Sequence, residues 1–197
     1  MLGRIYDWQL PLERAALAAA AELAAPSESD RLLDVATGTG GLLRELSRRG
    51  TLPAEVVGID SSPSMLAVAS AKGLPARWRL LESHAESLPF RDQRFDVVTA
   101  CYLLHLLERE ARARTIAEIA RVVLPGGRVV TVTVECPRPA ARAALARLPK
   151  RSGLRPLDPS DELCAAGLEP QRARIVRDGW PSLCVLAQRR LSQRPPA

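Results

Sequence analysis

The chain has 197 residues, of which 47% are hydrophobic and 25% charged, and these values are typical of a globular domain with room for a sizeable core. No apolar run is long enough to span a bilayer, and the four cysteines form no CxxC pair, so we expect neither a membrane anchor nor a disulfide framework or zinc site. Acidic residues precede and interrupt the alanine-rich stretch 15–25, whereas a signal peptide begins with basic residues. These features predict one domain, over 1–197, in the cytoplasm.

The net charge of +6 is unevenly distributed, because residues 1–100 carry −2 and residues 101–197 carry +8. Lys72 and Lys150 are the only lysines, and every other basic residue is arginine. This bias is typical of a GC-rich genome. We do not expect nucleic acid as a partner, because no aromatic residues alternate with the arginines. The sequence does not indicate an oligomeric state.

The pattern of apolar and polar residues predicts alternating helices and strands. Helices are expected at 10–24, 41–49, 63–71, 111–123 and 159–166, and strands at 31–36, 55–60, 76–83, 94–100, 128–134, 169–177 and 182–189. Continuous apolar strands between helices indicate a parallel sheet covered on both faces. The last two strands are joined by a turn at Asp178-Gly179, so they are expected to pair antiparallel. The fold class is α/β, with a mostly parallel seven-stranded sheet and a C-terminal antiparallel pair.

The stretch LLDVATGTGGLL, residues 32–43, places an acid near the end of the first strand and three glycines after it. In an open parallel sheet, ligands bind at the carboxyl ends of the strands, where this turn lies. Asp60 ends the second strand, 22 residues after Gly38, and a carboxylate there can accept two hydrogen bonds from a ribose diol. Alternatively, Asp60 could cap the helix that starts at Pro63, a role that Ser62 could also fill.

The spacing of the glycines argues against a dinucleotide. The fingerprint G-x-G-x-x-G would require glycine where Leu43 stands, and the leucine side chain is expected to obstruct close packing of helix on strand, with no visible compensation. The pattern that fits is D-x-A-x-G-x-G, which begins at Asp34.

Four segments in order, LLDVATGTG, VVGIDSSPSML, ESLPFRDQRFDVV and RVVLPGGRVV, resemble the successive motifs of class I S-adenosylmethionine-dependent methyltransferases. The tail, LCAAGLEP with two strands, resembles the end of that fold, so the resemblance covers nearly the whole chain. The chain is most similar to the branch that includes the ubiquinone and menaquinone C-methyltransferases, where alanine is common at the Ala36 position. This resemblance implies a Rossmann-like three-layer sandwich and S-adenosyl-L-methionine as cofactor.

The resemblance also implies a set of cofactor-binding residues, namely Asp34, Ala36, Thr37, Gly38, Gly40, Asp60, Ser61, Met65, His84, Ala85 and Cys101. In that family, the glycine turn and its leading acid hold the methionine end, and the acid of the second strand binds the ribose. Ser61 and Met65 would flank the adenine, with His84 and Ala85 at its edge. His84 departs from the family, which usually has aspartate there; a neutral imidazole can still accept a hydrogen bond, but His84 could equally be a surface residue.

The chemistry requires alignment of a nucleophile with an activated methyl group, and some acceptors also need a base. The candidate bases are His105, Tyr102, Tyr6 and Glu135. Of these, His105 and Tyr102 follow the fourth strand, and the resemblance places Tyr102 with Cys101 at the methyl-transfer site. His105 could be the base or could position its neighbours.

Two segments are candidate covers of this site. Residues 1–30 form an N-terminal helical segment in which Tyr6 and Trp8 could belong to a lid or pack against the core. Residues 137–159 form a short, basic, proline-rich segment that could cover the acceptor or be a solvated loop. The sequence thus predicts direct methyl transfer to a small-molecule acceptor. The alternatives are a macromolecular acceptor, RNA or protein, and a non-catalytic protein that binds S-adenosylmethionine.

Overall fold

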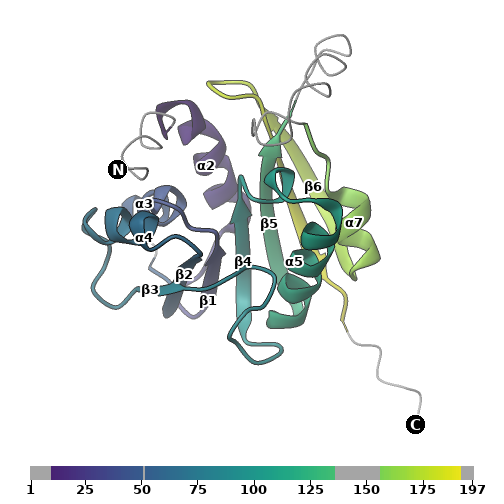
Figure 1. The fold of residues 1–197 in the computed structure, drawn as a ribbon, viewed down its shortest axis with the longest axis horizontal. Helices are drawn as coiled ribbons and strands as arrows, with labels where there is room; N and C mark the ends of the chain where they lie inside the picture. The colour runs from purple at the N-terminus through teal and green to yellow at the C-terminus, as the bar shows by residue number, and fades with distance from the viewer. Residues whose placement is uncertain (1–9, 51, 136–155, 192–197) are drawn as a thin grey trace.

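The structure, a computed structural model, describes residues 10–50, 52–135 and 156–191 (Figure 1). Its centre is a seven-stranded sheet in the order β3-β2-β1-β4-β5-β7-β6. Strands β1 to β5 pair in parallel, and β7 pairs antiparallel with both β5 and β6. The predicted α/β class is therefore confirmed, including the antiparallel pair at the C-terminal end. The strand order reverses beside β1, and such a point in an open sheet is where ligands bind.

The boundaries of the elements follow the sequence closely. The strands are β1 (Arg31–Val35), β2 (Glu55–Asp60), β3 (Arg79–Glu82), β4 (Phe95–Cys101), β5 (Val123–Val134), β6 (Leu168–Val176) and β7 (Ser182–Arg189). The helices are α2 (Leu10–Ala24), α3 (Gly41–Arg48), α4 (Pro63–Ser70), α5 (Arg109–Val122) and α7 (Ser160–Ala165), with a short 3-10 helix, η1 (Leu104–Leu106), that was not expected. Most boundaries lie within two residues of the prediction.

Strand β5 is the main departure, because it starts at Val123 and not at Arg128. The pairing with β4 passes from Phe95–Val123 directly to Val97–Arg128, so the residues between them bulge out of the ladder. Gly126 adopts a φ of 76° within that bulge. The Pro-Gly-Gly sequence between the expected helix 111–123 and the expected strand 128–134 is thus a bulge inside the strand, so the strand begins five residues earlier than predicted.

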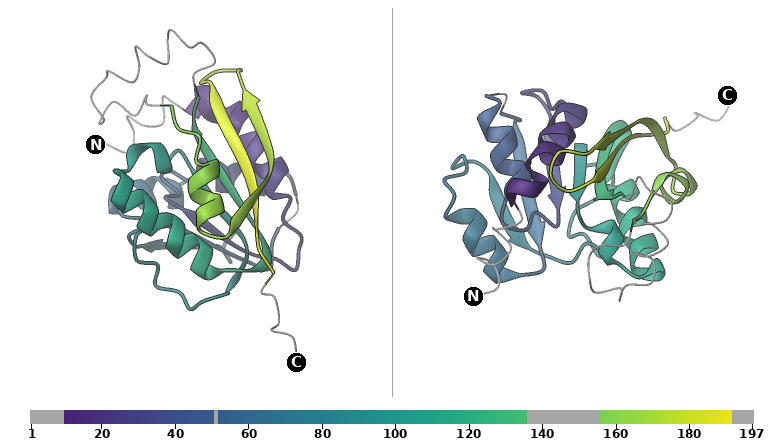
Figure 2. Two further views of the ribbon diagram at one scale, coloured as in Figure 1. Left: turned by 90° about the vertical axis from the view of Figure 1, so that its right-hand side faces the viewer. Right: turned by 90° about the horizontal axis from the view of Figure 1, so that it is seen from above.

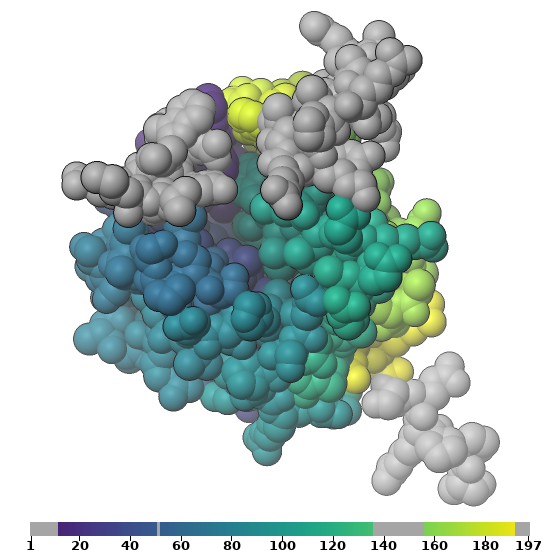
Figure 3. All heavy atoms as spheres, in the orientation of Figure 1, coloured from purple at the N-terminus to yellow at the C-terminus, as the bar shows by residue number. Residues whose placement is uncertain are grey.

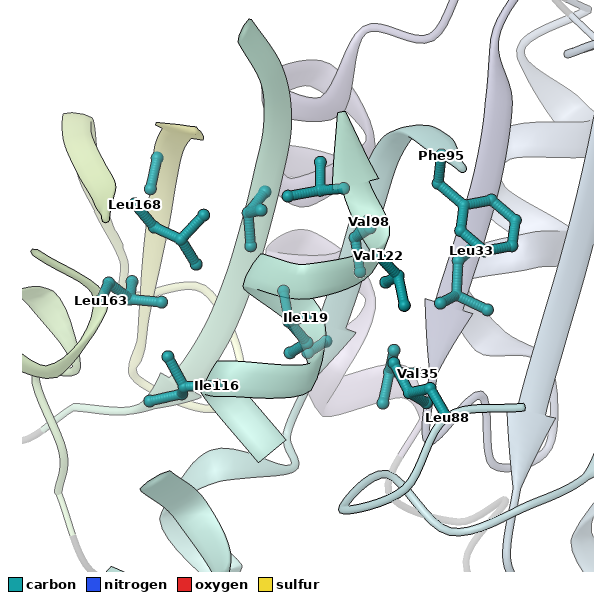
Figure 4. Packing of buried hydrophobic residues seen from close by; sticks show 14 of the residues in the cluster. Leu33, Val35, Leu88, Phe95, Val98, Ile116, Ile119, Val122, Leu163 and Leu168 are labelled. Carbon is teal, nitrogen blue, oxygen red and sulfur yellow. The ribbon is translucent and has the colours of Figure 1, made fainter. Parts of the chain in front are cut away.

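Two apolar clusters hold the helices on opposite faces of the sheet (Figure 2). Along β1, Leu32 belongs to the cluster formed with α2 and α3, whereas Leu33 belongs to the cluster formed with α5 and α7. Figure 4 shows the second cluster, where Ile116, Ile119 and Val122 of α5 lie against the sheet. Because neighbouring residues of a strand point to opposite faces, Asp34 lies on the same face as Leu32, under α2 and α3.

The packing of α3 on the sheet corrects one sequence-based expectation. Leu43 is fully buried, and it does not hold the helix away from the strand. The compensation is Gly58 of β2, where an added Cβ would lie 3.0 Å from Leu43 Cδ1. A glycine on the strand therefore provides the space that a glycine on the helix provides in the dinucleotide fingerprint.

Helix α2 is joined to the β6–β7 hairpin at two points. The N–H of Trp180 donates to the carbonyl of Leu12 over 2.8 Å, and the thiol of Cys184 lies 3.7 Å from the carbonyl of Ala16. The space-filling view shows the hairpin end, in yellow, beside purple α2 at one end of the molecule (Figure 3). Since β7 runs antiparallel to β5, this hairpin and the start of α2 both lie at the carboxyl ends of β4 and β5.

Within the described ranges, none of the helices combines the length and hydropathy required to cross a membrane. The proposed lid residues Tyr6 and Trp8, and all but the last four residues of the basic segment 137–159, lie outside the described ranges.

Candidate functional site

Asp34 is a buried carboxylate held by two threonine hydroxyls. The Thr37 hydroxyl donates to one carboxylate oxygen and the Thr99 hydroxyl to the other, each over 2.7 Å. Only 2% of Asp34 is exposed. Burial raises its pKa to about 6, the two hydroxyl hydrogen bonds act in the opposite direction, and the charge of Asp60 adds to the rise. Asp34 can thus gain or lose a proton near neutral pH, with its oxygens held in fixed directions.

The turn after β1 brings backbone close to the sheet edge. Ala36, Gly38 and Gly40 all have left-handed φ values, of 56°, 56° and 76°. The space in front of Gly38 is open, because an added Cβ would come no closer than 4.0 Å to any atom outside its immediate neighbours. At Gly40, by contrast, an added Cβ would lie 3.2 Å from the Ala69 side chain of α4. Gly40 thus serves the packing of the turn, whereas Gly38 leaves room for a ligand.

Asp60 is fixed at the end of β2 by two backbone N–H groups. Gly38 N–H donates to one carboxylate oxygen and Ser62 N–H to the other, each over 2.9 Å. Ser62 itself occupies the N-cap position of α4. Asp60 thus accepts a hydrogen bond from the N-cap residue of α4 and is not itself the N-cap. Each carboxylate oxygen has a further lone pair available, which the hydroxyls of a diol require.

The residues expected around the adenine lie at the same edge. In the register of β2 with β3, Asp60 stands beside Glu82, and Ser83 N–H donates to the Asp60 carbonyl over 3.1 Å. This contact brings His84 and Ala85, which follow directly, next to the end of β2. His84 and Ser61 are exposed, while Met65 and Ala85 are half-buried. The structure therefore gathers these residues at one edge, and His84 makes no described contact that assigns it to the core.

Cys101 ends β4 on the other side of the strand-order reversal, and Tyr102 follows it. Cys101 lies near Asp34; burial raises the pKa of its thiol well above the ordinary value, and the Asp34 charge adds to this effect. Tyr102 has a φ of 57°, an uncommon value for a bulky residue, and its N–H donates to the Val132 carbonyl over 2.7 Å. A thiol with a raised pKa stays protonated, so Cys101 contributes shape and not charge.

The hydroxyl of Tyr102 is part of a hydrogen-bond chain. It lies 2.8 Å from the Ser182 hydroxyl, which donates to the Trp180 carbonyl over 2.8 Å. Since Ser182 uses its only proton on that carbonyl, the Tyr102 hydroxyl is the donor in its bond with Ser182. Burial raises the pKa of Tyr102 far above the ordinary value. A neutral phenol that donates to a buried serine suits positioning better than proton abstraction.

The two other described candidate bases lie close by. His105, in η1, is 8% exposed, and its ring meets the Tyr102 ring edge-on with 6.1 Å between centroids. Glu135 follows β5, is half-buried, and its N–H donates to the Pro181 carbonyl over 2.9 Å. The structure thus brings Tyr102, His105 and Glu135 to the carboxyl end of β4 and β5. Tyr6 lies outside the described residues.

Four residues that shape this site were not singled out from the sequence: Glu13, Gly58, Thr99 and Ser182. Thr99 and Gly58 stand inside apolar strands, where a threonine or a glycine is ordinary. Glu13 could have been noticed as the acid that begins the apolar stripe of a helix, at the spacing of residues 16, 17, 20 and 24. Ser182 becomes meaningful only when β7 is placed beside β5.

Comparison with known proteins agrees with this geometry. The family model described as "Methyltransferase domain" matches residues 32–127. A demethylmenaquinone methyltransferase from Thermus thermophilus is 42% identical over 117 residues, which are 57% of this chain and 51% of that protein. A ubiquinone/menaquinone biosynthesis C-methyltransferase UbiE from Stutzerimonas stutzeri is 38% identical over 120 residues, 59% of this chain and 46% of that protein. The chain therefore spans about half the length of these curated relatives.

The fold is shared more widely. The structure of an O-methyltransferase family protein from Burkholderia thailandensis superimposes with a TM-score of 0.76, at 21% sequence identity, and covers 96% of this chain and 59% of that one. At this identity the likeness concerns the fold alone.

Fold and site together define a Rossmann-like methyltransferase domain of class I, the class whose cofactor is S-adenosylmethionine. Within that class, the chain is similar to the UbiE-like relatives over slightly more than half of its length. The residues present fit the cofactor, because the open face of Gly38 adjoins a fixed carboxylate at Asp60 and a buried one at Asp34.

Proposed function

We propose that the chain transfers a methyl group directly from S-adenosylmethionine to a small-molecule acceptor of the quinol type. The names of its relatives, demethylmenaquinone methyltransferase and ubiquinone/menaquinone C-methyltransferase, support this acceptor class. None of the described contacts favours a macromolecular acceptor or a protein without catalysis.

The main support for the cofactor-binding part of the proposal is the hydrogen bond from Gly38 N–H to the Asp60 carboxylate. It ties the glycine turn to the residue that would bind the ribose, so both are oriented before a ligand arrives. Asp34 would attract the ammonium of the methionine end, and Ala36 and Thr37 would shape the turn around it. Ser61, Met65, His84 and Ala85 would surround the adenine.

When bound, S-adenosylmethionine supplies a methyl group that its sulfonium already activates. The protein therefore has to orient the acceptor and keep water away from it. Cys101 and Tyr102 would form the wall beside the methyl group, because Cys101 is the last residue of β4 and Tyr102 follows it, next to the face that carries Asp34. Tyr102 is held in place by Ser182, and His105 packs against its ring.

Three further assignments remain part of the proposal. Residues 1–197 would form a single methyltransferase domain, residues 1–30 would contribute a helical lid, and residues 137–159 would cover the acceptor. The cytoplasm is the location that we propose on the sequence alone.

Two measurements test the proposal. Titration calorimetry should detect binding of S-adenosylhomocysteine and none of NAD or NADP; the reverse result would overturn the cofactor assignment. Transfer of labelled methyl from S-adenosylmethionine to a reduced, short-chain 1,4-naphthoquinol tests the acceptor class. Label transferred to total RNA or protein, and not to the quinol, would favour a macromolecular acceptor. Cofactor binding without transfer to any of the three would favour a non-catalytic role.

A further inference from the structure

Glu13 occupies an unusual place for a carboxylate, at the start of the buried stripe of α2. One and two turns further along, Ala16, Leu17 and Ala20 of the same stripe are buried against the sheet. Glu13 is half-buried and lies on the side of α2 that packs against the sheet. Among the described residues, no hydrogen bond or ion pair compensates it, and burial raises its pKa above the ordinary value.

The anchors of α2 place Glu13 at the acceptor side. Leu12, the preceding residue, accepts from Trp180 N–H, and Ala16, three residues later, lies beside the Cys184 thiol. The segment between these two contacts faces the part of β7 that contains Ser182. Ser182 in turn holds the Tyr102 hydroxyl.

Electrostatics on the opposite side agree with this placement. The charge of Glu13 contributes to the raised pKa of both Cys101, the last residue of β4, and Tyr102, which follows it. Cys101 also responds to the charge of Asp34. Glu13 is therefore near enough for its charge to act on the two residues that we propose for the wall of the methyl-transfer site.

We propose that Glu13 is the catalytic base that takes a hydroxyl proton from the acceptor. This inference rests on the proposed function. The acceptor's O–H bond breaks and its proton moves to the Glu13 carboxylate, while the electron pair remains on the acceptor as an aryloxide. The electron-rich ring carbon then forms a bond to the methyl carbon as the carbon–sulfur bond breaks. The ring carbon then loses the hydrogen that the methyl group displaced and the oxygen regains a proton, so the products are S-adenosylhomocysteine and the methylated quinol, with one proton in total released to solvent.

A carboxylate suits this task when solvent is partly removed from it. Catalytic bases work best when their pKa lies near the operating pH, and active sites raise carboxyl pKa values through burial. Tyr102 is less suited, because its hydroxyl donates to Ser182. Because burial raises its pKa, Tyr102 stays a neutral phenol, whereas the oxygens of Glu13 accept no hydrogen bond from the described residues and can take up a proton.

The test compares Glu13→Gln, which keeps the shape and removes the base, with Glu13→Asp, which keeps a base on a shorter chain. Glu22→Gln is the matched control, since Glu22 lies on the same helix, is exposed, and pairs with Arg174 over 2.8 Å. The probe is a short-chain 1,4-naphthoquinol kept reduced, with labelled S-adenosylmethionine. Binding of S-adenosylhomocysteine, binding of the quinol to that complex, and the melting temperature are measured on every variant.

We expect Glu13→Gln to lower kcat by about 10² to 10⁴-fold and to remove the acidic limb of the pH profile. S-adenosylhomocysteine binding should stay within about twofold, and the melting temperature should stay equal or rise, because a poorly solvated carboxylate disfavours the fold. Glu13→Asp should retain measurable activity and the acidic limb, and Glu22→Gln should match the wild type in kcat.

Four results would overturn one or both proposals. A wild-type protein that does not bind S-adenosylhomocysteine overturns the proposed function. One that binds it but neither binds nor methylates the quinol overturns the acceptor class and the role of Glu13 together. If the wild type is active and Glu13→Gln has the same kcat and pH profile, the role of Glu13 alone is overturned. The same holds if Glu13→Gln has a lowered melting temperature and no longer binds the cofactor.

Discussion

The backbone N–H of Gly38 donates to Asp60 Oδ2 over 2.9 Å and thereby joins the turn after β1 to the end of β2. Asp60 Oδ1 accepts the N–H of Ser62 in the same way. The carboxylate is thus held by backbone on both sides, so its direction does not depend on a flexible partner. Three of our predictions follow from the turn and the two acids beside it.

Asp60→Ala should weaken binding of S-adenosylmethionine and S-adenosylhomocysteine by about 10- to 100-fold, because hydrogen bonds to a charged group contribute roughly 1.5–3 kcal/mol and water recovers part of that. Asp60→Asn should cost less, since its amide oxygen still accepts. Titration calorimetry measures both, and circular dichroism checks that the fold persists. Equal affinities for the wild type and Asp60→Ala would contradict the ribose role.

Asp34 should make both stability and cofactor binding depend on pH. Its folded pKa, about 6, lies above the ordinary value of 3.8, so the folded state retains a proton that the unfolded state has lost between about pH 4 and 6. The Asp34 contribution to stability is therefore lost as the pH rises through that window, by up to about 3 kcal/mol. The melting temperature of Asp34→Asn, relative to wild type, should increase between pH 4 and 7.

Binding of S-adenosylmethionine should show the opposite trend. The ionised Asp34 attracts the ammonium of the methionine end, so affinity in the wild type should fall as the pH drops below about 6. Asp34→Asn should bind more weakly at pH 7.5 and show a flatter pH dependence. The same pH dependence in both proteins would place the ammonium away from Asp34.

Gly58→Ala should destabilise the protein by about 1–3 kcal/mol, because the new methyl group would lie 3.0 Å from Leu43 Cδ1, Leu80 Cδ2 and Thr37 Oγ1. Displacement of Thr37 should also weaken cofactor binding through Asp34. The double variant Gly58→Ala/Leu43→Ala should lose less free energy of unfolding than the two single variants lose together, and chemical denaturation measures this difference. Strict additivity would mean that Leu43 and residue 58 do not share the space.

Tyr102 and Ser182 should respond unequally to mutation. Tyr102→Phe removes one donor and leaves Ser182 bonded to Trp180, so it should cost about 1 kcal/mol. Ser182→Ala leaves the partly buried Tyr102 hydroxyl without its acceptor and should cost more, about 1–3 kcal/mol. Denaturant titration measures both. A larger loss in Tyr102→Phe than in Ser182→Ala would reverse the direction that we assign to the hydrogen bond.

His105→Ala separates a base from a positioning residue. Because His105 packs edge-on against Tyr102, its removal should lower kcat by about tenfold or less, with the acidic limb of the pH profile kept. A base would instead lose about 10² to 10⁴-fold and that limb. Steady-state rates between pH 5 and 9 with the reduced naphthoquinol distinguish the two cases.

Local sequence signals predicted the fold well, because its strands are continuous apolar runs and its turns carry Gly and Pro. The cofactor edge was also predictable, since one rule places the ends of parallel strands together, and Asp34, Gly38 and Asp60 indeed meet there. What escaped prediction depends on contacts between distant segments. Leu43 was judged too large because its partner Gly58 lies on another strand.

The acceptor side escaped for the same reason. Glu13 and Tyr102 are 89 positions apart in the chain, and only the β6–β7 hairpin brings α2 to the end of β4. Strand β5 was placed too late because a Pro-Gly-Gly sequence is a reliable turn signal in isolation, whereas here it forms a bulge between paired residues.

The bond between Trp180 N–H and the Leu12 carbonyl has a consequence for how this protein could diversify. The groups that we propose for the cofactor stand on consecutive segments, β1, β2 and the turns after them. The groups beside Tyr102 instead come from α2 and β7, near opposite ends of the chain, and this bond helps to set their spacing. A residue inserted at Asp178-Gly179 would move Ser182 relative to Glu13 and leave Asp60 in place. Acceptor preference could then be altered at the hairpin while the recognition of the methyl donor is inherited unchanged.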